Sequence, residues 1–306
     1  MTGHRYVTLD VFTDTRFGGN PLAVVLEAEG LSDAAMQSIA REFNYSETTF
    51  VLPPRDPSHT AWVRIFTPRE ELPFAGHPNV GTAVALAQRL SGAAPEHFLF
   101  EEGAGLVPLR LLRQEGRVTG AEFAAPEPLS TTPAASREEV ARCLSLAPGD
   151  VAEDPVMASV GLPFCVARLA SAGALARARA DRAAFAALRL PGGRRSIYAC
   201  VAEGEDALQS RCFIQGEYED PATGSATAAA TAWLLSRRGG DSLRLRVRQG
   251  EAMGRPSLLL ARAERRDGAI HAHVGGGAVP VMEGFLQAAA VARRSGTLFP
   301  AAAVTR

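Results

Sequence analysis

Two short segments, residues 74–83 and 220–228, share a composition that suits anion binding. In each, a turn of Gly, Pro and small polar residues runs into an Ala-rich stretch that favours a helix. The start of a helix presents free backbone N–H groups together with the positive end of the helix dipole. We therefore expect the two segments to form one carboxylate-binding cleft.

Two ionisable residues stand within these segments. His77 follows Gly76 at the start of the first expected helix, where the positive dipole end disfavours a charged imidazolium. A neutral imidazole there can donate or accept a proton, while a histidine that caps the helix or fills the pocket wall is the structural alternative. Asp220 is held in an extended conformation by Pro221, so that its carboxylate can face the cleft. A plain N-cap aspartate is the alternative for Asp220.

The elements that must position these residues recur in both halves of the chain. Gly76 and Gly224 are separated by the same number of positions as Pro108 and Pro256. We interpret this repetition as the duplication of one ancestral unit. We expect strands over 19–26, 47–52 and 61–66 and a helix over 32–43 in the first half, and strands over 161–168, 196–201 and 209–214 and a helix over 181–188 in the second.

The helices expected after the two loops, 82–87 and 226–235, are apolar or small on nearly every face. This pattern is typical of a helix enclosed by protein. The expected fold class is therefore α/β (α+β), with two pseudo-symmetric domains that each curl a mostly antiparallel sheet around a central helix.

The boundary between the halves is visible in the composition. Residues 124–133 are rich in Pro and Thr, and a capping box from Ser136 to Glu139 then begins a new helix. We expect domains at residues 1–130 and 131–286, with a last strand at 277–281. The tail, residues 287–306, is expected either to pack on one of the domains or to be disordered.

Composition excludes several classes of partner. The 32 basic and 33 acidic residues give a net charge of −1, which predicts no nucleic-acid or membrane partner. No stretch approaches about 18 uninterrupted apolar residues, and the start lacks the apolar region of a signal peptide, so we expect a cytoplasmic protein. The four cysteines lack metal spacing, and His271 and His273 have no third ligand nearby. These patterns predict buried thiols and no metal site.

Three ordered motifs carry a family resemblance. Residues 44–50 (Asn-Tyr-Ser-Glu-Thr-Thr-Phe), 74–78 (Phe-Ala-Gly-His-Pro) and 219–226 (Glu-Asp-Pro-Ala-Thr-Gly-Ser-Ala) resemble those of the PhzF-like isomerases of phenazine biosynthesis. The resemblance runs from about Tyr6 to Glu283 and includes residues 249–256 (Gln-Gly-Glu-Ala-Met-Gly-Arg-Pro). It implies a diaminopimelate-epimerase-like fold, an active site between two such domains, a homodimer and no cofactor.

The resemblance also implies the chemistry. Matched by motif, Glu47 is the general acid/base that takes a proton from one carbon of an amino acid and returns it to another. A carboxyl group at the end of an apolar strand can have its pKa raised by desolvation towards the range useful at neutral pH, and an ordinary ion pair is the alternative. His77 and Asp220 complete the catalytic set. The expected substrate-binding residues are Asn20, Gly76, Pro78, Asn79, Thr223, Gly224 and Ser225.

Two of these binding residues have structural alternatives. Ser225 also suits a tightly packed helix, and Asn20 also suits the turn before Pro21. One departure from the superfamily narrows the chemistry, because the loops lack the pair of cysteines that serve as opposed bases in its epimerase branch. Ala75 and the Pro221-Ala222 pair stand there instead, which argues against two-base thiol racemisation.

The strand equivalent to that of Glu47 offers Ile197 or Tyr198 in the second half, so we expect an asymmetric catalytic set. We predict a cofactor-independent isomerase that shifts a proton on a small, cyclic amino or hydroxy carboxylic acid. Two alternatives stay open. One is epimerisation or elimination, as by a dehydratase, at the same site. The other is a binding protein of this fold without turnover.

Overall fold

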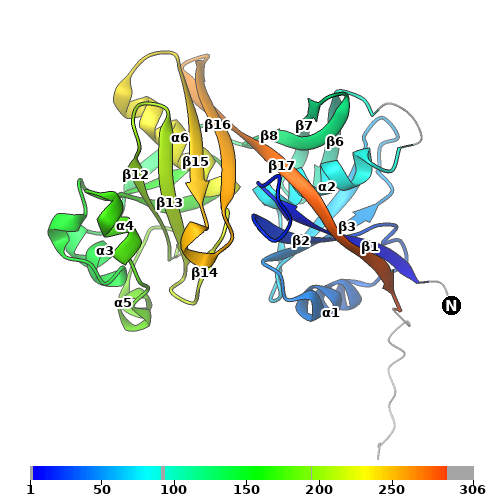
Figure 1. The fold of residues 1–306 in the computed structure, drawn as a ribbon, viewed down its shortest axis with the longest axis horizontal. Coiled ribbons are helices and arrows are strands. Elements are labelled where there is room, and N and C mark those ends of the chain that lie inside the picture. Colours follow the sequence, from blue (N-terminus) through cyan, green and yellow to red (C-terminus); the bar gives the residue numbers. More distant parts are fainter. Residues whose placement is uncertain (1–2, 91–93, 194, 288–306) are drawn as a thin grey trace, which may run out of the picture.

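The computed structural model describes residues 3–90, 94–193 and 195–287. Figure 1 shows the elements of the first half gathered on one side and most elements of the second half on the other. The long strand β17 (Ala269–Leu286) runs from one group into the other, because it pairs with β16 (Ser257–Arg266), then β8 (Arg117–Ala124), then β1 (His4–Val11). The result is a mixed α/β fold dominated by strands.

The remaining elements follow the expected order closely. The strands expected at 47–52 and 61–66 have these bounds, and Ser32 caps the first helix instead of belonging to it. In the first half the other elements are β2 (Asn20–Val25), α1 (Asp33–Phe43), β3 (Glu47–Leu52), β4 (Ala61–Phe66), β5 (Glu71–Leu72), α2 (Gly76–Ala87), β6 (His97–Glu102) and β7 (Gly105–Gln114). In the second they are β9 (Ser130–Pro133), α3 (Arg137–Cys143), η1 (Pro148–Asp150), β10 (Val156–Ser159), β11 (Pro163–Arg168), α4 (Ala172–Arg177), α5 (Arg182–Ala187), β12 (Ser196–Ala202), β13 (Ala207–Ile214), β14 (Tyr218–Asp220), α6 (Gly224–Arg238), β15 (Ser242–Gln249) and η2 (Glu251–Met253).

The two halves use the same order of strand pairings. In the first, β2 and β3 are parallel, β3 and β4 antiparallel, β4 and β6 parallel, and β6, β7 and β8 successively antiparallel. In the second, β11 and β12 are parallel, β12 and β13 antiparallel, β13 and β15 parallel, and β15, β16 and β17 successively antiparallel. A short hairpin strand, β5 or β14, precedes the corresponding helix in each half.

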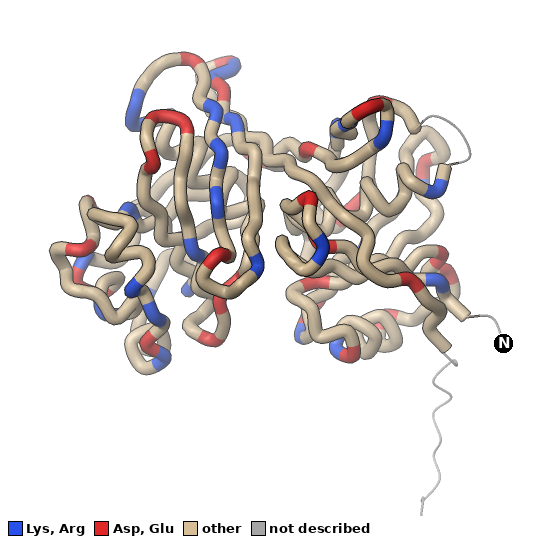
Figure 2. The backbone as a smooth tube through the Cα atoms, in the orientation of Figure 1, with Lys and Arg blue, Asp and Glu red and all other residues tan. Residues whose placement is uncertain are grey.

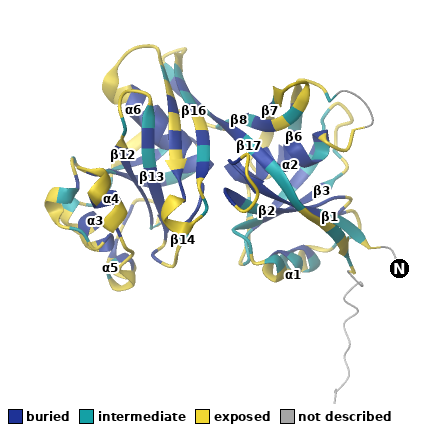
Figure 3. Ribbon diagram, in the orientation of Figure 1, coloured by how far each residue is buried: buried dark blue, intermediate teal, exposed yellow. Residues whose placement is uncertain are grey.

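Helices α2 and α6 lie in the interior of these pairings. All residues of α2 except Leu86 are buried, and α2 packs against β1, β2, β8 and β17. Residues 224–235 of α6 are all buried, and α6 packs against β11, β15, β16 and β17. Figure 3 shows the contrast with helices such as α1, which present exposed faces. The many Ala and Gly residues of α2 and α6 let the surrounding strands approach these two helices closely.

Local capping signals place several boundaries. Ser136 and Glu139 form the expected capping box at the start of α3. Asn44 ends α1 in the left-handed conformation, with φ 53°, and turns the chain directly into β3. The expected linker at 124–133 is partly structured, because its Thr-rich end forms β9 and pairs with β10. The last strand is longer than expected, and residues 288–306 of the tail lie outside the described residues.

The surface agrees with the balanced composition. Figure 2 shows basic and acidic residues interspersed over both groups of elements. The four cysteines are buried and free, as expected. No helix in the described ranges combines the length and hydrophobicity that crossing a bilayer requires. Within the same ranges, no group of three or more metal-binding side chains is found.

Candidate active site

A cavity of about 440 Å³ opens between residues of the two halves. Its lining from the first half comprises 44–47, the turn 67–70, Leu72 and Ala75. The second half contributes Leu162, Phe164, several residues between 214 and 220, Thr223 and Ser225. The expected residues Glu47, Asp220, Thr223 and Ser225 therefore line one cavity, although they are far apart in the sequence.

Glu47 is the first residue of β3, immediately after the tight turn at Asn44 and Ser46. Its side chain is 17% exposed, and its Oε2 lies 3.3 Å from Nδ1 of His77. His77 is buried in the first turn of α2, and burial lowers its pKa to about 3. The imidazole is therefore neutral at physiological pH, as the sequence predicted, but burial is the main cause.

His77 lies behind the cavity wall. Its Nδ1 is also 3.4 Å from Nδ2 of Asn20, and its Nε2 is buried without a hydrogen-bond partner among the described residues. A neutral His77 can donate from Nδ1 to Glu47 or accept there from Asn20, according to its tautomer. In the tautomer with its hydrogen on Nδ1, His77 can orient the carboxyl group of Glu47 without carrying a charge.

Asp220 ends β14 and is buried. Its Oδ1 accepts hydrogen bonds from Nδ2 of Asn20 at 3.0 Å and from Oγ of Ser46 at 3.3 Å, and its Oδ2 accepts from Oγ1 of Thr223 at 2.5 Å. Burial raises the pKa of Asp220 to about 6, although these hydrogen bonds oppose the shift. The N-cap residue of α6 is Thr223, so the alternative of a plain N-cap aspartate is wrong.

The starts of α2 and α6 lie close together. A Cβ added to Gly76 would come within 3.3 Å of the backbone N of Ser225 and within 2.7 Å of the Phe123 ring. The N-cap residues Ala75 and Thr223 make no side-chain capping hydrogen bond. Backbone N–H groups of both first turns are thus left without a side-chain cap beside the cavity, which suits an anionic group.

Gln249 supports this region and was given no role in the sequence prediction. Its Nε2 donates to the backbone oxygen of Asp220 at 2.7 Å and to Oγ1 of Thr223 at 3.0 Å, and its Oε1 accepts from the backbone N of Thr223 at 3.2 Å. One buried amide therefore fixes the loop that carries Asp220 and Thr223. The sequence motif at 249–256 begins with this glutamine and could have indicated that it has a role.

Other predicted binding residues do not reach the cavity lining. Pro78 and Asn79 lie inside α2, and Asn79 donates from Nδ2 to the Ala75 backbone oxygen at 3.1 Å. Asn79 therefore holds the loop that enters the helix. Asn20, Gly76 and Gly224 are likewise buried behind the lining residues. Conversely, Tyr45, Ser46 and Arg69 line the cavity but were not among the predicted site residues.

The strand register adds Ser196 to the expected counterparts of Glu47 in the second half. Glu47 pairs with Leu22 of β2, and the parallel register of β11 and β12, in which Cys165 pairs with Ile197, places Ser196 at the equivalent position. Ser196 is buried. The expected Ile197 and Tyr198 follow Ser196 on the same strand, β12, and none of the three has a carboxyl group.

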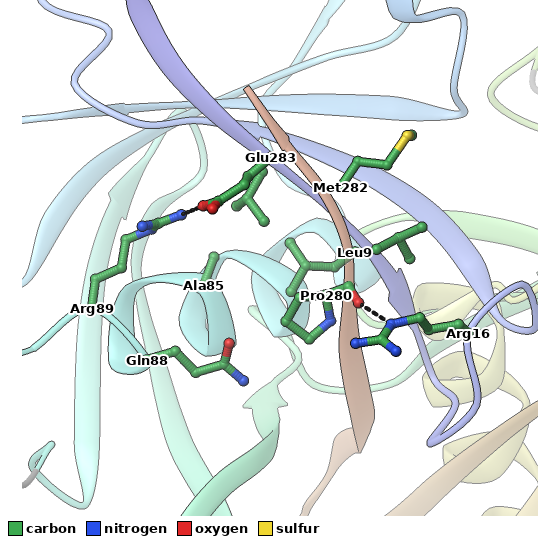
Figure 4. A pocket seen from close by; sticks show the side chains of 10 residues that line it. Leu9, Arg16, Ala85, Gln88, Arg89, Pro280, Met282 and Glu283 are labelled. Atoms are coloured by element: carbon green, nitrogen blue, oxygen red, sulfur yellow. Dashed lines mark hydrogen bonds and ion pairs between the residues drawn. The ribbon is translucent and has the colours of Figure 1, made fainter. Parts of the chain in front are cut away.

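A second cavity, of about 300 Å³, contains none of the predicted site residues. It lies between the end of α2 and β17, where Arg89 faces Glu283 at 3.6 Å and Nε of Arg16 donates to the Pro280 backbone oxygen at 2.8 Å (Figure 4). The predicted chemistry is therefore concentrated in the first cavity. Among the described residues no cysteine lines that first cavity, and burial raises the pKa of Cys165 to about 12.

The chain is similar to known proteins over most of its length. A family model described as phenazine biosynthesis-like protein matches residues 9–284. An uncharacterized isomerase of Mesorhizobium japonicum is 40% identical over 307 residues, which span 94% of this chain and 99% of that protein. A trans-2,3-dihydro-3-hydroxyanthranilate isomerase of Pseudomonas chlororaphis is 38% identical over 274 residues, 86% of this chain and 91% of that protein.

The fold is also found among solved structures. A phenazine biosynthesis protein of the PhzF family from Bacillus anthracis has a TM-score of 0.84, with 24% identity over 94% of this chain and 99% of that one. At this level of identity the likeness concerns the fold alone. It agrees with the strand-rich α/β architecture described above.

Proposed function

This chain belongs to the phenazine biosynthesis-like protein family and is an isomerase, and from this premise we propose that it shifts a proton on a small, cyclic amino or hydroxy carboxylic acid. The observation that carries the proposal is the position of Glu47. Glu47 lines the cavity between the two halves together with Asp220 and Ser225. Its Oε2 lies 3.3 Å from Nδ1 of the neutral His77.

In this proposal Glu47 removes a proton from one carbon and returns it to another. His77 holds the carboxyl group in place, and Asp220 is a second group that can exchange a proton near pH 6. The N–H groups at the start of α6, with Ser225, bind the substrate carboxylate. A proton moved from one carbon to another within one molecule changes neither the overall oxidation state nor the number of atoms, which agrees with our proposal that the reaction uses no cofactor.

The arrangement supports a directional transfer. Glu47 lines the cavity from β3, whereas Ser196, at the equivalent position of β12, is buried and is not one of the lining residues, so the two halves contribute different groups to the site. Two-base epimerisation would need a second base opposite the first. The matching order of strand pairings in the two halves supports our further proposal that both descend from one duplicated unit.

The experiment is incubation of the chain with trans-2,3-dihydro-3-hydroxyanthranilate in deuterated water, followed by NMR and mass analysis. The expected result is an isomer with deuterium at the carbon that receives the proton. Deuterium at the original carbon with inverted configuration would indicate epimerisation, and loss of water would indicate a dehydratase. A panel of cyclic amino and hydroxy acids that shows neither exchange nor thermal stabilisation would contradict the proposal and favour a protein without turnover.

A further inference from the structure

Arg69 and Glu217 form an ion pair between the two halves at the candidate active site. Both residues line the cavity of Glu47 and Asp220, and Nη1 of Arg69 lies 2.6 Å from Oε2 of Glu217. Their side chains are 71% and 43% exposed, so the pair lies on the solvent side of the cavity. Arg69 belongs to the turn between β4 and β5, and Glu217 to the turn between β13 and β14.

The backbone on the Arg69 side is well fixed. In its turn the Thr67 backbone N donates to the Glu70 backbone oxygen at 2.8 Å, and the Arg69 backbone N donates to Oγ1 of Thr67 at 3.1 Å. Nε2 of Gln37 on α1 also donates to the Thr67 backbone oxygen at 2.9 Å. Hydrogen bonds therefore fix the backbone of Arg69, while its long side chain can rotate and move the guanidinium group.

The Glu217 side is equally constrained. The Glu217 backbone N donates to the Ile214 backbone oxygen at 3.0 Å, and Gln215 and Gly216 have φ of 54° and 74°. A Cβ at Gly216 would come within 2.6 Å of the Phe185 side chain, so this turn packs tightly against α5. A change of partner at this pair can therefore take place by side-chain rotation.

Arg69 differs in charge from the other ionisable side chains that line the cavity. The lining contains four carboxyl side chains, those of Glu47, Glu70, Glu217 and Asp220. Arg69 is the single basic residue among the lining residues that the structure describes. A carboxylate that enters this cavity therefore meets several carboxyl groups, which repel it when they are ionised, and one guanidinium group, which attracts it. Exposed ion pairs contribute little to stability, so an incoming carboxylate can replace Glu217 as the partner of Arg69 at little cost.

We propose that Arg69 is a specificity-determining residue that captures the substrate carboxylate at the cavity entrance, and that Glu217 is its internal competitor. The inference rests on the proposed function in one respect, the carboxylic acid class of the substrate. Arg69 exchanges Glu217 for the incoming carboxylate, and its positive charge still attracts that carboxylate once the N–H groups at the start of α6 bind it in the same cavity. Glu217 occupies the guanidinium when the cavity is empty.

Two variants that each remove one charge, Arg69→Gln and Glu217→Gln, test substrate capture against one alternative. In that alternative, which we call a latch, the ion pair only holds the two halves together. Anthranilate is the carboxylate probe and anthranilamide its neutral counterpart, with binding followed by calorimetry on the full chain. Under the capture proposal, Arg69→Gln weakens anthranilate binding by about five-fold, and Glu217→Gln strengthens it because the competitor is gone. Anthranilamide binding changes little in either variant. Arg69→Lys restores part of the anthranilate affinity, and Arg142→Gln on α3 is the control for net charge.

The outcomes distinguish the two levels of inference. A latch requires both variants to act in the same direction on both probes, because each breaks the same ion pair, and that result would overturn the capture proposal. Unchanged anthranilate binding in Arg69→Gln would also overturn it while leaving the proposed isomerase intact. If the unmodified chain binds neither anthranilate nor the cyclic acids of the turnover panel, the carboxylate class itself is wrong and both proposals fail.

Discussion

Nδ2 of Asn20 donates a hydrogen bond of 3.0 Å to Oδ1 of Asp220, which lies 200 positions later in the chain. The same Nδ2 is 3.0 Å from the Ala222 backbone oxygen and 3.4 Å from Nδ1 of His77. Asn20 is fully buried at the start of β2. One amide thus joins the first half of the chain to the loop before α6 and connects Asp220 with the histidine that contacts Glu47.

Asn20→Ala is expected to lower the free energy of unfolding by about 1–3 kcal/mol, because it removes one of the hydrogen bonds to the buried Asp220 carboxylate and the Asn20 donor of the Ala222 backbone oxygen. Ser46→Ala removes a longer, 3.3 Å hydrogen bond to the same carboxylate and should cost less. Urea denaturation of both variants at pH 7 measures the difference. Equal losses would show that the hydrogen bonds of Asn20 contribute no more to stability than the longer bond of Ser46.

Glu47→Gln is expected to reduce turnover by about 10²–10⁴-fold, since the amide cannot take up and return a proton. The fold should be retained, because Glu47 is a partly exposed residue at the strand start. Turnover and deuterium exchange are measured beside a thermal melt. The control is Glu42→Gln, which removes the same charge from the exposed face of α1. A fully active Glu47→Gln variant would rule out the proposed base.

We expect Glu102, at the end of β6, to make the free energy of unfolding depend on pH. Burial raises its pKa from 4.5 to about 8, with a smaller opposing effect of the Asn79 side chain. Because the folded-state pKa is the higher one, its contribution is complete below about pH 4.5 and is lost as the pH rises towards 8.

We therefore expect Glu102→Gln to remove a downward slope of up to about 1.4 kcal/mol per pH unit from the unfolding free energy. Denaturant titrations from pH 5 to 9 measure this slope. Exposed Glu96, shortly before β6, supplies the matched control Glu96→Gln, which should follow the unmodified chain. Parallel curves for Glu102→Gln and the unmodified chain would contradict the raised pKa.

Gly76→Ala is expected to cost about 1–3 kcal/mol of stability and to lower activity, because its methyl group would lie 2.7 Å from the Phe123 ring. The displaced ring also packs near Gly224, so the two helix starts would separate. Gly224→Ala is the comparison, since its nearest contact, the Phe12 ring, would be 3.1 Å away. If Gly224→Ala proved the more damaging of the two, our account of the facing helix starts would be wrong.

The sequence by itself determined the local elements. Ser32 and the Ser136–Glu139 box mark helix starts through hydrogen bonds to residues three positions away, so short segments contain the whole signal. The strands at 47–52 and 61–66 follow equally local patterns. The motifs also named Glu47, Asp220, Thr223 and Ser225, which the structure brings to one cavity.

The tertiary structure decided which groups face that cavity and which support it. Asn79 donates to the Ala75 backbone oxygen, and Ser196 takes the position on β12 that is equivalent to Glu47 on β3, because helix rotation and strand register are set by packing. The support by Gln249 and the pair of Arg69 with Glu217 join residues of distant segments. Their geometry follows from the path of the whole chain, which no local pattern of residues contains.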